Sequence, residues 1–436
     1  MTADPSRRSE RGRPVASALD AHLRDKGKGE DRKSGNYRAD AERELGRFIE
    51  WLRRDMGGDS PAADAVGGPT ADGDAGENAT VEPTFADLDE RVFRRYARYL
   101  AGLGNEATTT ETYYAYVSSF CGWAVDEGYL NRHHAATSVA RAPLPEDTGR
   151  RSGDQQAWTP EQRDRITRHV DDRASAAIDA MARSTPEEGS EFAAVRACRD
   201  RALVYLLAYT GVRAAEILRD PDDTRRTGLR WSDIDFDDRA MTVFRKKQEW
   251  DDASLPEPVL HPLRIYTRLL DPPDDEWPVF PTLHRPTLAA LVRDGLADRG
   301  LDEDEIETVR EEGGPDLLVC RDRDLGPPAS ITANGARKRL KRLCEAAGIE
   351  LDDRHGYLAP HGGRRGMGEV LVRSFGHAEA ARYLDNSEAM VRRRYSHIEA
   401  GEQAGLATAA LAESDGRVSD GGGAETDADG HSDGDG

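Results

Sequence analysis

Two short basic stretches, PHGGRRG at residues 360–366 and RRRYSHI at residues 392–398, decide how the rest of the chain is interpreted. Apolar residues recur at helical spacing after the first stretch, which predicts a helix over residues 364–375 that ends at Gly376. Ser387 is a good N-cap residue and predicts a second helix, which delivers three arginines and a tyrosine. The segment is therefore interpreted as two helices with basic residues at both outer ends.

His361 and Arg364 are three residues apart at a helix start, so both side chains can face one point where free backbone N–H groups favour an anion. Tyr395 supplies a hydroxyl, a weak nucleophile with an ordinary pKa of about 10. Arginines around its target would hold and polarise a phosphate. The alternative is that His361 and Arg364 are loop residues and that residues 392–394 form a solvated helix face.

The chain has 436 residues, enough for two or three domains with cores of their own. It contains no apolar run long enough to span a bilayer, and its polar, arginine-rich start is unlike a secretion signal. The four cysteines are far apart, without the paired spacing of a zinc site. These features predict a cytoplasmic protein with reduced thiols and no structural metal.

The net charge of −21 is concentrated in two segments. Residues 57–82 carry six acidic residues and no base, and residues 413–436 carry eight acidic residues and one arginine, so together they account for −13. Both segments are rich in Gly, Ala and Asp and are predicted to be disordered. The remainder is far less acidic and has arginine clusters.

Lysine is scarce, and arginine carries nearly all of the positive charge. The lysines are Lys26, Lys28, Lys33, Lys246, Lys247, Lys338 and Lys341. This balance resembles that of proteins from halophilic archaea, in which concentrated salt screens self-repulsion. An acidic protein from a high-GC bacterium is the alternative.

In the N-terminal third of the chain, the composition predicts a flexible basic arm over residues 1–33 and a helical domain over residues 34–147. A disordered acidic insert at residues 57–83 is predicted to interrupt this domain. Apolar periodicity predicts three helices, at residues 37–56, 87–103 and 108–129. Their basic residues suit phosphate contacts as well as a solvated surface: Arg91, Arg94, Arg95, Arg98, Arg132, His133 and His134.

A second domain is predicted over residues 155–412. Pro160 marks a helix start, and a helix from residue 193 breaks at Thr210-Gly211, which places Arg213 at the start of the next helix. An alternating strand follows at residues 241–247.

The chain then turns at residues 250–252 and returns over residues 255–260, where Pro256 and Pro258 predict an edge strand. Lys246 and Lys247 lie on this hairpin, and strand alternation would let only one of them face a site.

Three fragments in this order resemble the tyrosine recombinases, the phage-integrase and Xer-type family. TGVRAAEI at residues 210–217 matches the family pattern Thr-Gly-Leu-Arg-x-x-Glu-Leu, HGGRR at residues 361–365 matches His-x-Leu-Arg-His, and YSH at residues 395–397 matches Tyr-x-His. The resemblance covers roughly residues 34–412. It implies a mainly helical α+β fold, in which a helical core-binding domain precedes a mostly helical catalytic domain with a small antiparallel sheet.

The resemblance also implies roles for individual residues. Arg213 and Arg364 would grip the non-bridging oxygens of a DNA phosphate, and Tyr395 would attack phosphorus to leave a 3′-phosphotyrosyl bond. His361 would assist proton movement at the attacking side. Lys246, with Lys247 as the alternative, would protonate the departing 5′ oxygen.

One departure from the family concerns Asn386, which stands where the family has His or Trp. An amide donates a hydrogen bond to a phosphate oxygen but carries no proton. Arg365 in place of the family's second histidine is a milder departure. Another interpretation of Arg213 is a surface pair with Glu216.

The implied partner is double-stranded DNA bound by a homotetramer, with no cofactor, metal, membrane or small-molecule substrate. Residues 402–411 would pack on a neighbouring subunit, and residues 413–436 would form a disordered acidic tail. Two alternatives remain open: a cleavage-deficient DNA-binding relative with an architectural or regulatory role, and a nicking-closing enzyme of the type IB topoisomerase kind.

Overall fold

A computed structural model of the chain divides into two compact units, an N-terminal one within residues 1–149 together with 220–226, and a C-terminal one from the remaining residues. Both are mostly helical, and the described residues contain a single small antiparallel sheet, so the expected α+β fold class is confirmed. The structure describes residues 11–27, 35–57, 82–146, 155–183, 190–351 and 355–420.

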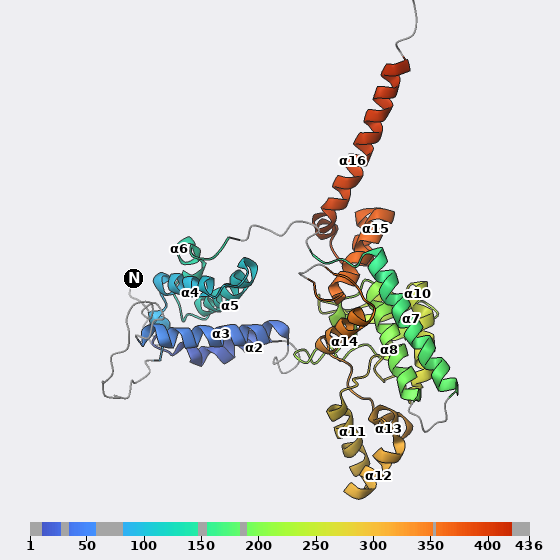
Figure 1. Cartoon of the computed structure of the whole chain (residues 1–436). Coiled ribbons are helices and arrows are strands. Elements are labelled where there is room, and N and C mark those ends of the chain that lie inside the picture. Colours follow the sequence, from blue (N-terminus) through green and yellow to red (C-terminus); the bar gives the residue numbers. More distant parts are fainter. Residues whose placement is uncertain are drawn as a thin grey trace, which may run out of the picture. The chain divides into compact units, whose positions relative to one another are not determined.

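The N-terminal unit packs its helices around a core rich in aromatic side chains (Figure 1). Phe48 on one helix contacts Phe93 and Tyr96 on another, which follows from the apolar stripes of the sequence. Its helices are η1 (Val15–Ala18), α2 (Leu19–Lys26), α3 (Asn36–Met56), η2 (Phe85–Asp87), α4 (Glu90–Gly102), α5 (Ala107–Asp126), η3 (His134–Ala136) and α6 (Ser138–Arg141).

The prediction of a flexible arm is wrong for residues 11–27. Val15 and Leu23 are buried in the aromatic core, and the ring of His22 lies edge-on to Phe120 and Trp123. The polar and basic residues around them hide a short apolar face that is sufficient to dock a helix. The rest of the predicted arm, and residues 58–81 of the predicted acidic insert, lie outside the described residues.

The C-terminal unit is built around α8, which packs against both α7 and α10 (Figure 1). Its first helices and strands are α7 (Pro160–Arg183), α8 (Ser190–Tyr209), α9 (Ala214–Ile217), η5 (Trp231–Asp233), β1 (Ile234–Asp235), β2 (Ala240–Phe244), β3 (Trp250–Ser254) and α10 (Glu257–Leu270). The strands pair in the order β1-β2-β3. The helix start at Pro160 and the break after α8 agree with the sequence predictions.

The predicted edge strand after β3 is instead the start of α10. Pro256 is the N-cap residue and Pro258 lies in the first turn, where the missing N–H has no helical partner to lose. The two prolines therefore begin a helix here. β2 and β3 form a short hairpin, and its turn contacts Asp385, which lies between the last two helices.

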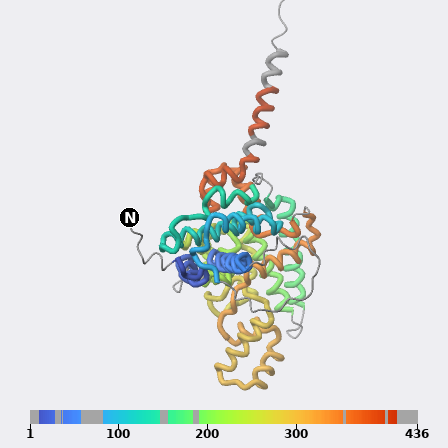
Figure 2. Tube along the Cα trace, turned by 90° about the vertical axis from the view of Figure 1, so that its left-hand side faces the viewer, coloured from blue at the N-terminus to red at the C-terminus, as the bar shows by residue number. Residues whose placement is uncertain are grey.

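Figures 1 and 2 show α11, α12 and α13 packed on one another at one end of this unit. The helix α14 follows, with four basic residues on its exposed face. These elements span α11 (Arg285–Ala297), α12 (Glu303–Gly313), α13 (Asp316–Asp322) and α14 (Ala333–Ala346).

The last two helices carry the stretches that opened the sequence analysis. In α15 (Pro360–Tyr383), Gly376 has φ of 81° and interrupts the helix, as predicted. Ser387 caps α16 (Glu388–Asp420), and Tyr395, with φ of −111° and ψ of 20°, breaks this helix in its second turn.

The predicted disorder from residue 413 is wrong up to Asp420, because α16 continues to that residue. Alanines at residues 404–412 favour continuation of the helix. Residues 421–436 lie outside the described part. All four cysteines are buried and unpaired, and no helix among the described residues is both long and apolar enough to cross a membrane.

Candidate active site

Arg213 is held at the start of α9 by a turn that favours glycine at residue 211. Gly211 has φ of +68°, and a Cβ added there would lie 2.7 Å from Leu384 Cδ2. The Arg213 N–H donates to Glu216 Oε2 over 2.8 Å, which closes the first turn of the short helix. The Thr-Gly-Val-Arg sequence thus fixes the direction in which the arginine leaves the backbone.

The Arg213 guanidinium is oriented by two side chains. Its Nη1 donates to Glu216 Oε1 over 2.7 Å, and its Nη2 donates to Asn386 Oδ1 over 3.2 Å. The side chain of Glu216 is only 1% exposed, and it also pairs with Arg245 Nη1 at 3.4 Å. The pairing of Arg213 with Glu216 is therefore present, but it is a buried pair that positions a cation rather than a surface contact.

Arg364 connects two distant segments from the first turns of α15. It is 5% exposed, and its guanidinium donates to the carbonyl oxygen of Gly211 over 2.6 Å and to that of Leu384. Burial, and after it the charge of the neighbouring Arg213, lower the pKa of Arg364 to about 10. The side chain still carries its charge at neutral pH, so a buried cation lies beside the Gly211 turn.

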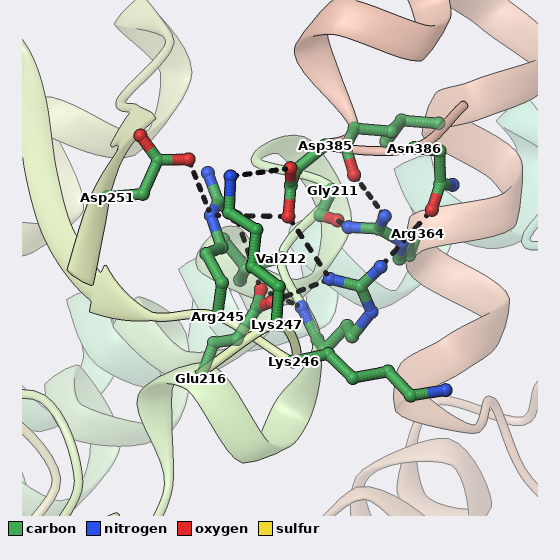
Figure 3. Close-up of polar contacts among 12 residues, drawn as sticks. Gly211, Val212, Glu216, Arg245, Lys246, Lys247, Asp251, Arg364, Asp385 and Asn386 are labelled. Carbon is green, nitrogen blue, oxygen red and sulfur yellow. Dashed lines mark hydrogen bonds and ion pairs between the residues drawn. The ribbon is translucent and has the colours of Figure 1, made fainter. Parts of the chain in front are cut away.

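The turn between β2 and β3 brings Lys247 to this cluster. Because β2 ends at Phe244, both hairpin lysines lie in the turn, and strand alternation does not decide between them. Both lysines are exposed, but Lys247 Nζ lies 3.7 Å from Asp385 Oδ1, whereas the ammonium of Lys246 points away from the cluster (Figure 3). Lys247, which the sequence analysis gave as the alternative proton donor, therefore lies against the cluster. Lys246, the first choice, does not.

A third arginine, Arg245, joins the cluster and was missed in the sequence. It is 4% exposed, donates from Nη2 to the Asp252 carbonyl oxygen over 2.8 Å, and lies with Nε 3.4 Å from Asp251 Oδ2 (Figure 3). The sequence did contain a signal for the burial of Arg245. Met241, Val243 and Arg245 follow the period of two that places alternate residues on one buried face. An arginine in such a series needs buried anionic partners.

Asp385 places a carboxylate among the three cations, which the sequence analysis also missed. Its Oδ2 lies 3.9 Å from Arg213 Nη1 and 3.9 Å from Arg245 Nε, in addition to the contact with Lys247. The backbone at Asp385 has φ of 46°, a left-handed conformation that aims the side chain back toward the cluster (Figure 3). The next residue, Asn386, uses its amide oxygen to accept from Arg213.

The phenol of Tyr395 is buried under α15 beside Arg364. Its hydroxyl donates to the carbonyl oxygen of Arg365 over 3.3 Å, and a Cβ added to Gly368 would overlap it. Burial raises the pKa of Tyr395, while the positive charges of Arg394 and Arg364 act in the opposite direction. The tyrosine therefore lies next to the arginine cluster, with its hydroxyl bound to the helix backbone rather than to a guanidinium.

His361 occupies the exposed first turn of α15. Desolvation lowers its pKa, and so do the charges of Arg365, Arg364, Arg213 and, least, Arg394. An imidazole with a lowered pKa is neutral at pH 7, so it is able to accept a proton from a neighbouring acid.

Taken together, these residues form a cationic cluster near a buried phenol. Arginines in this number bind a tetrahedral oxyanion through charge-assisted hydrogen bonds. Among the described residues, no group of histidine, cysteine or carboxylate side chains is arranged to hold a metal ion.

No protein-family model matches the sequence, and no curated protein sequence matches it. The chain is similar to solved structures of three recombinases at low identity. A Tn1549 transposon integrase in complex with transposon right end DNA is 11% identical, with coverage of 91% of this chain and 100% of that chain and a TM-score of 0.47.

A lambda integrase dimer bound to a COC′ core site is 13% identical, with coverage of 80% of this chain and 94% of that chain and a TM-score of 0.38. A XerA recombinase is 13% identical, with coverage of 87% of this chain and 92% of that chain and a TM-score of 0.31.

Proposed function

We propose that this chain is a site-specific DNA recombinase or integrase of the tyrosine type, which cuts and rejoins strands through a 3′-phosphotyrosyl intermediate. The observation that carries the proposal is that Arg364 hydrogen-bonds the turn that leads to Arg213 and acts electrostatically on the buried Tyr395 phenol, while Lys247 and Arg213 share the neighbour Asp385. The three cations and the phenol come from separate segments, and their chemistry matches the needs of phosphoryl transfer to a tyrosine.

In the proposed reaction, Arg213 and Arg364 bind the non-bridging oxygens of the scissile phosphate, and Arg245 adds positive charge behind them. Guanidinium groups remain charged throughout and match the geometry of phosphate oxygens. They stabilise the extra negative charge that develops as the phenol oxygen attacks phosphorus. No resident metal is required for this stabilisation.

Two proton transfers accompany the exchange of bonds. The Tyr395 phenol loses its proton to the neutral His361 as the bond from its oxygen to phosphorus forms. The bond from phosphorus to the 5′ oxygen breaks, and Lys247 gives that oxygen a proton. In the reverse step the 5′ hydroxyl attacks the phosphotyrosine, so the energy of the broken bond is conserved in the protein–DNA ester.

The resting position of Tyr395 requires a movement before attack. Its hydroxyl is hydrogen-bonded to the Arg365 carbonyl and must leave it to reach a bound phosphate. The helix break at Tyr395 supplies the freedom for this movement, because the residue is not locked in a continuous helical ladder.

The basic face of α14 supports binding of a duplex. Residues 333–344 contain no carboxylate, and the helix exposes four cations, Arg337, Lys338, Lys341 and Arg342. In a chain with a net charge of −21, such a face is where phosphates are attracted. In the N-terminal unit, α4 exposes further arginines, Arg91, Arg94 and Arg98.

The finer expectations belong to the same proposal. The exposed residues 403–412 of α16, with Leu406 and Leu411, would pack on a neighbouring subunit of a homotetramer formed on DNA. The acidic composition would suit a cytoplasmic protein of a haloarchaeon, so assays belong in molar potassium chloride as well as in dilute buffer.

A suicide duplex with a nick close to the cleavage position tests the proposal, because loss of the short fragment traps the covalent complex. Wild-type protein is expected to form a denaturant-resistant adduct, and the Tyr395→Phe variant is expected to form none while binding the duplex equally well. Adduct formation by the Phe variant, or none by either protein, would overturn the assignment.

The burial of Tyr395 favours one alternative, a DNA-binding relative that no longer cuts. In that case the wild-type protein binds the duplex without an adduct. If an adduct forms, relaxation of a supercoiled plasmid without strand exchange between two sites would indicate a nicking-closing enzyme instead.

A further inference from the structure

The carboxylate of Asp385 occupies the position among the cations that a phosphate would need. It lies 3.7 Å from Lys247 Nζ and 3.9 Å from both Arg213 Nη1 and Arg245 Nε (Figure 3). Arg213 is the N-cap residue of α9, and Arg245 and Lys247 both lie in the turn between β2 and β3, so the carboxylate is the common neighbour of two separate segments. Its side chain remains 25% exposed, open to exchange with a solute.

The other two carboxylates of the cluster are held differently. Glu216 is buried and accepts hydrogen bonds from the Arg213 backbone and guanidinium, at 2.8 and 2.7 Å. Asp251 is more exposed and pairs with Arg245 alone, at 3.4 Å. Asp385 therefore combines contact with several cations and access to solvent.

The distances indicate that Asp385 is a weakly bound occupant. Separations of 3.7 to 3.9 Å are those of ion pairs without direct hydrogen bonds, whereas charge-assisted hydrogen bonds between nitrogen and oxygen are about 2.8 Å long. A DNA phosphodiester carries the same single negative charge as a carboxylate, but it is tetrahedral and is not tied to the backbone of residue 385. It would approach the same nitrogens more closely and displace the side chain.

We propose that Asp385 is an internal placeholder for the phosphate, which the DNA phosphodiester must displace before Arg213, Arg245 and Lys247 can bind it. This inference rests on the proposed function, since it assumes that the cluster receives a phosphate. In the resting protein the Asp385 carboxylate neutralises part of the positive charge of the cluster. A phosphate therefore binds there more weakly than it would if the carboxylate were absent. A duplex then enters only when contacts elsewhere also hold it.

Phosphate-dependent stabilisation against heat measures the competition without DNA cleavage. The proteins carry Tyr395→Phe so that no covalent chemistry contributes, and inorganic phosphate is the probe at constant ionic strength. In Asp385→Asn, the phosphate concentration at half-maximal stabilisation is expected to fall about fivefold to tenfold. Asparagine keeps the shape of the side chain and tolerates the left-handed backbone.

The matched control is Asp251→Asn, which removes a carboxylate that touches only one of the cations. Its midpoint is expected to stay within about twofold of the parent. Asp385→Gly provides a second test, because glycine adopts the same backbone conformation without strain. It is expected to shift the midpoint in the same direction as the asparagine variant.

An unchanged or higher midpoint in both Asp385 variants would overturn the placeholder and leave Asp385 as a residue that positions Lys247. So would the absence of phosphate stabilisation in every protein. The trapping assay separates this result from the recombinase proposal. Adduct formation with an unchanged midpoint removes only the placeholder, and a lowered midpoint without any adduct removes only the recombinase.

Discussion

The guanidinium of Arg364 donates to the carbonyl oxygen of Gly211 over 2.6 Å and so ties the start of α15 to the turn that carries Arg213. The same guanidinium also donates to the carbonyl oxygen of Leu384, just ahead of α16. One buried cation thus sets the relative positions of three segments of the candidate active site. Its charge and its hydrogen bonds serve the site and the fold together.

Arg364→Ala is expected to lower the free energy of unfolding by about 3 kcal/mol, because two buried carbonyl oxygens lose their donor. Urea denaturation of the C-terminal unit, followed by circular dichroism, measures the change. Arg364→Lys keeps the charge but lacks the fork that reaches both carbonyls, so an intermediate loss is expected. Wild-type stability in both variants would contradict a bridging role.

Gly368→Ala is expected to expel the Tyr395 ring, because the added methyl group overlaps the hydroxyl. Burial raises the pKa of Tyr395, so its release should bring the phenol back toward about 10. An ultraviolet titration, taken as the difference from the Tyr395→Phe protein in the same background, reports that pKa. Gly405→Ala on the exposed part of α16 is the matched control, since a Cβ there meets no neighbour and should leave the titration unchanged.

Lys247→Ala is expected to slow adduct formation about 100-fold, and Lys246→Ala to change it by less than about threefold, because only Lys247 lies against the cluster. A substrate with sulfur in place of the departing 5′ oxygen checks the chemical role. A thiolate leaves without a proton, so the Lys247→Ala defect should disappear with this substrate. A defect that persists would assign Lys247 to phosphate binding rather than to proton donation.

The basic face of α14 predicts a salt-dependent contribution to duplex binding. Lys338→Glu and Lys341→Glu should each weaken binding and reduce the slope of log affinity against log salt by about one. Fluorescence anisotropy with a labelled duplex at several potassium chloride concentrations gives both quantities. Arg293→Glu on the exposed side of α11 is the comparison, and an equal effect there would indicate a general charge effect.

His22 predicts a loss of stability at acid pH. Neither ring nitrogen has a hydrogen-bond partner among the residues that the structure describes, and the pKa of His22 is lowered to about 4 by burial and by Lys26, with Asp25 opposing them. Because the pKa in the folded protein lies below that of the unfolded chain, stability is full above about pH 6.5 and is lost as pH falls toward 4.

His22→Leu removes this titration, so the wild-type protein should lose about 2 kcal/mol more than the variant between pH 7.5 and pH 4.5. Urea unfolding of the N-terminal unit at the two pH values measures the difference. A gap between the two proteins that does not change with pH would show that His22 titrates normally.

The helices of both units were predictable because their apolar faces repeat with the helical period, as in α3, α4 and α8. The positions of Arg213 after Gly211 and of His361 at the start of α15 were predictable, because in each case a residue type and its local turn agree. In each case the information lies within one short segment. The predictions failed where the deciding partner is distant in sequence.

Asp385 illustrates the limit. Its neighbours in sequence gave no sign that a left-handed backbone would aim its carboxylate at cations contributed by α9 and the hairpin. The same holds for the choice between the two hairpin lysines, because Asp385, which Lys247 approaches, is distant from them in sequence. The return after β3 was misread because prolines begin helices as readily as they mark strand edges.

The double duty of Arg364 bears on how related sequences are to be interpreted. A homologue that does not cleave DNA would still need this arginine to keep its turns in place, so finding it in a homologue says little about catalysis. The hairpin lysine and the phenolic oxygen have no comparable duty in the fold. Loss of the lysine or the tyrosine, rather than retention of the buried arginine, would therefore distinguish a homologue without catalytic activity.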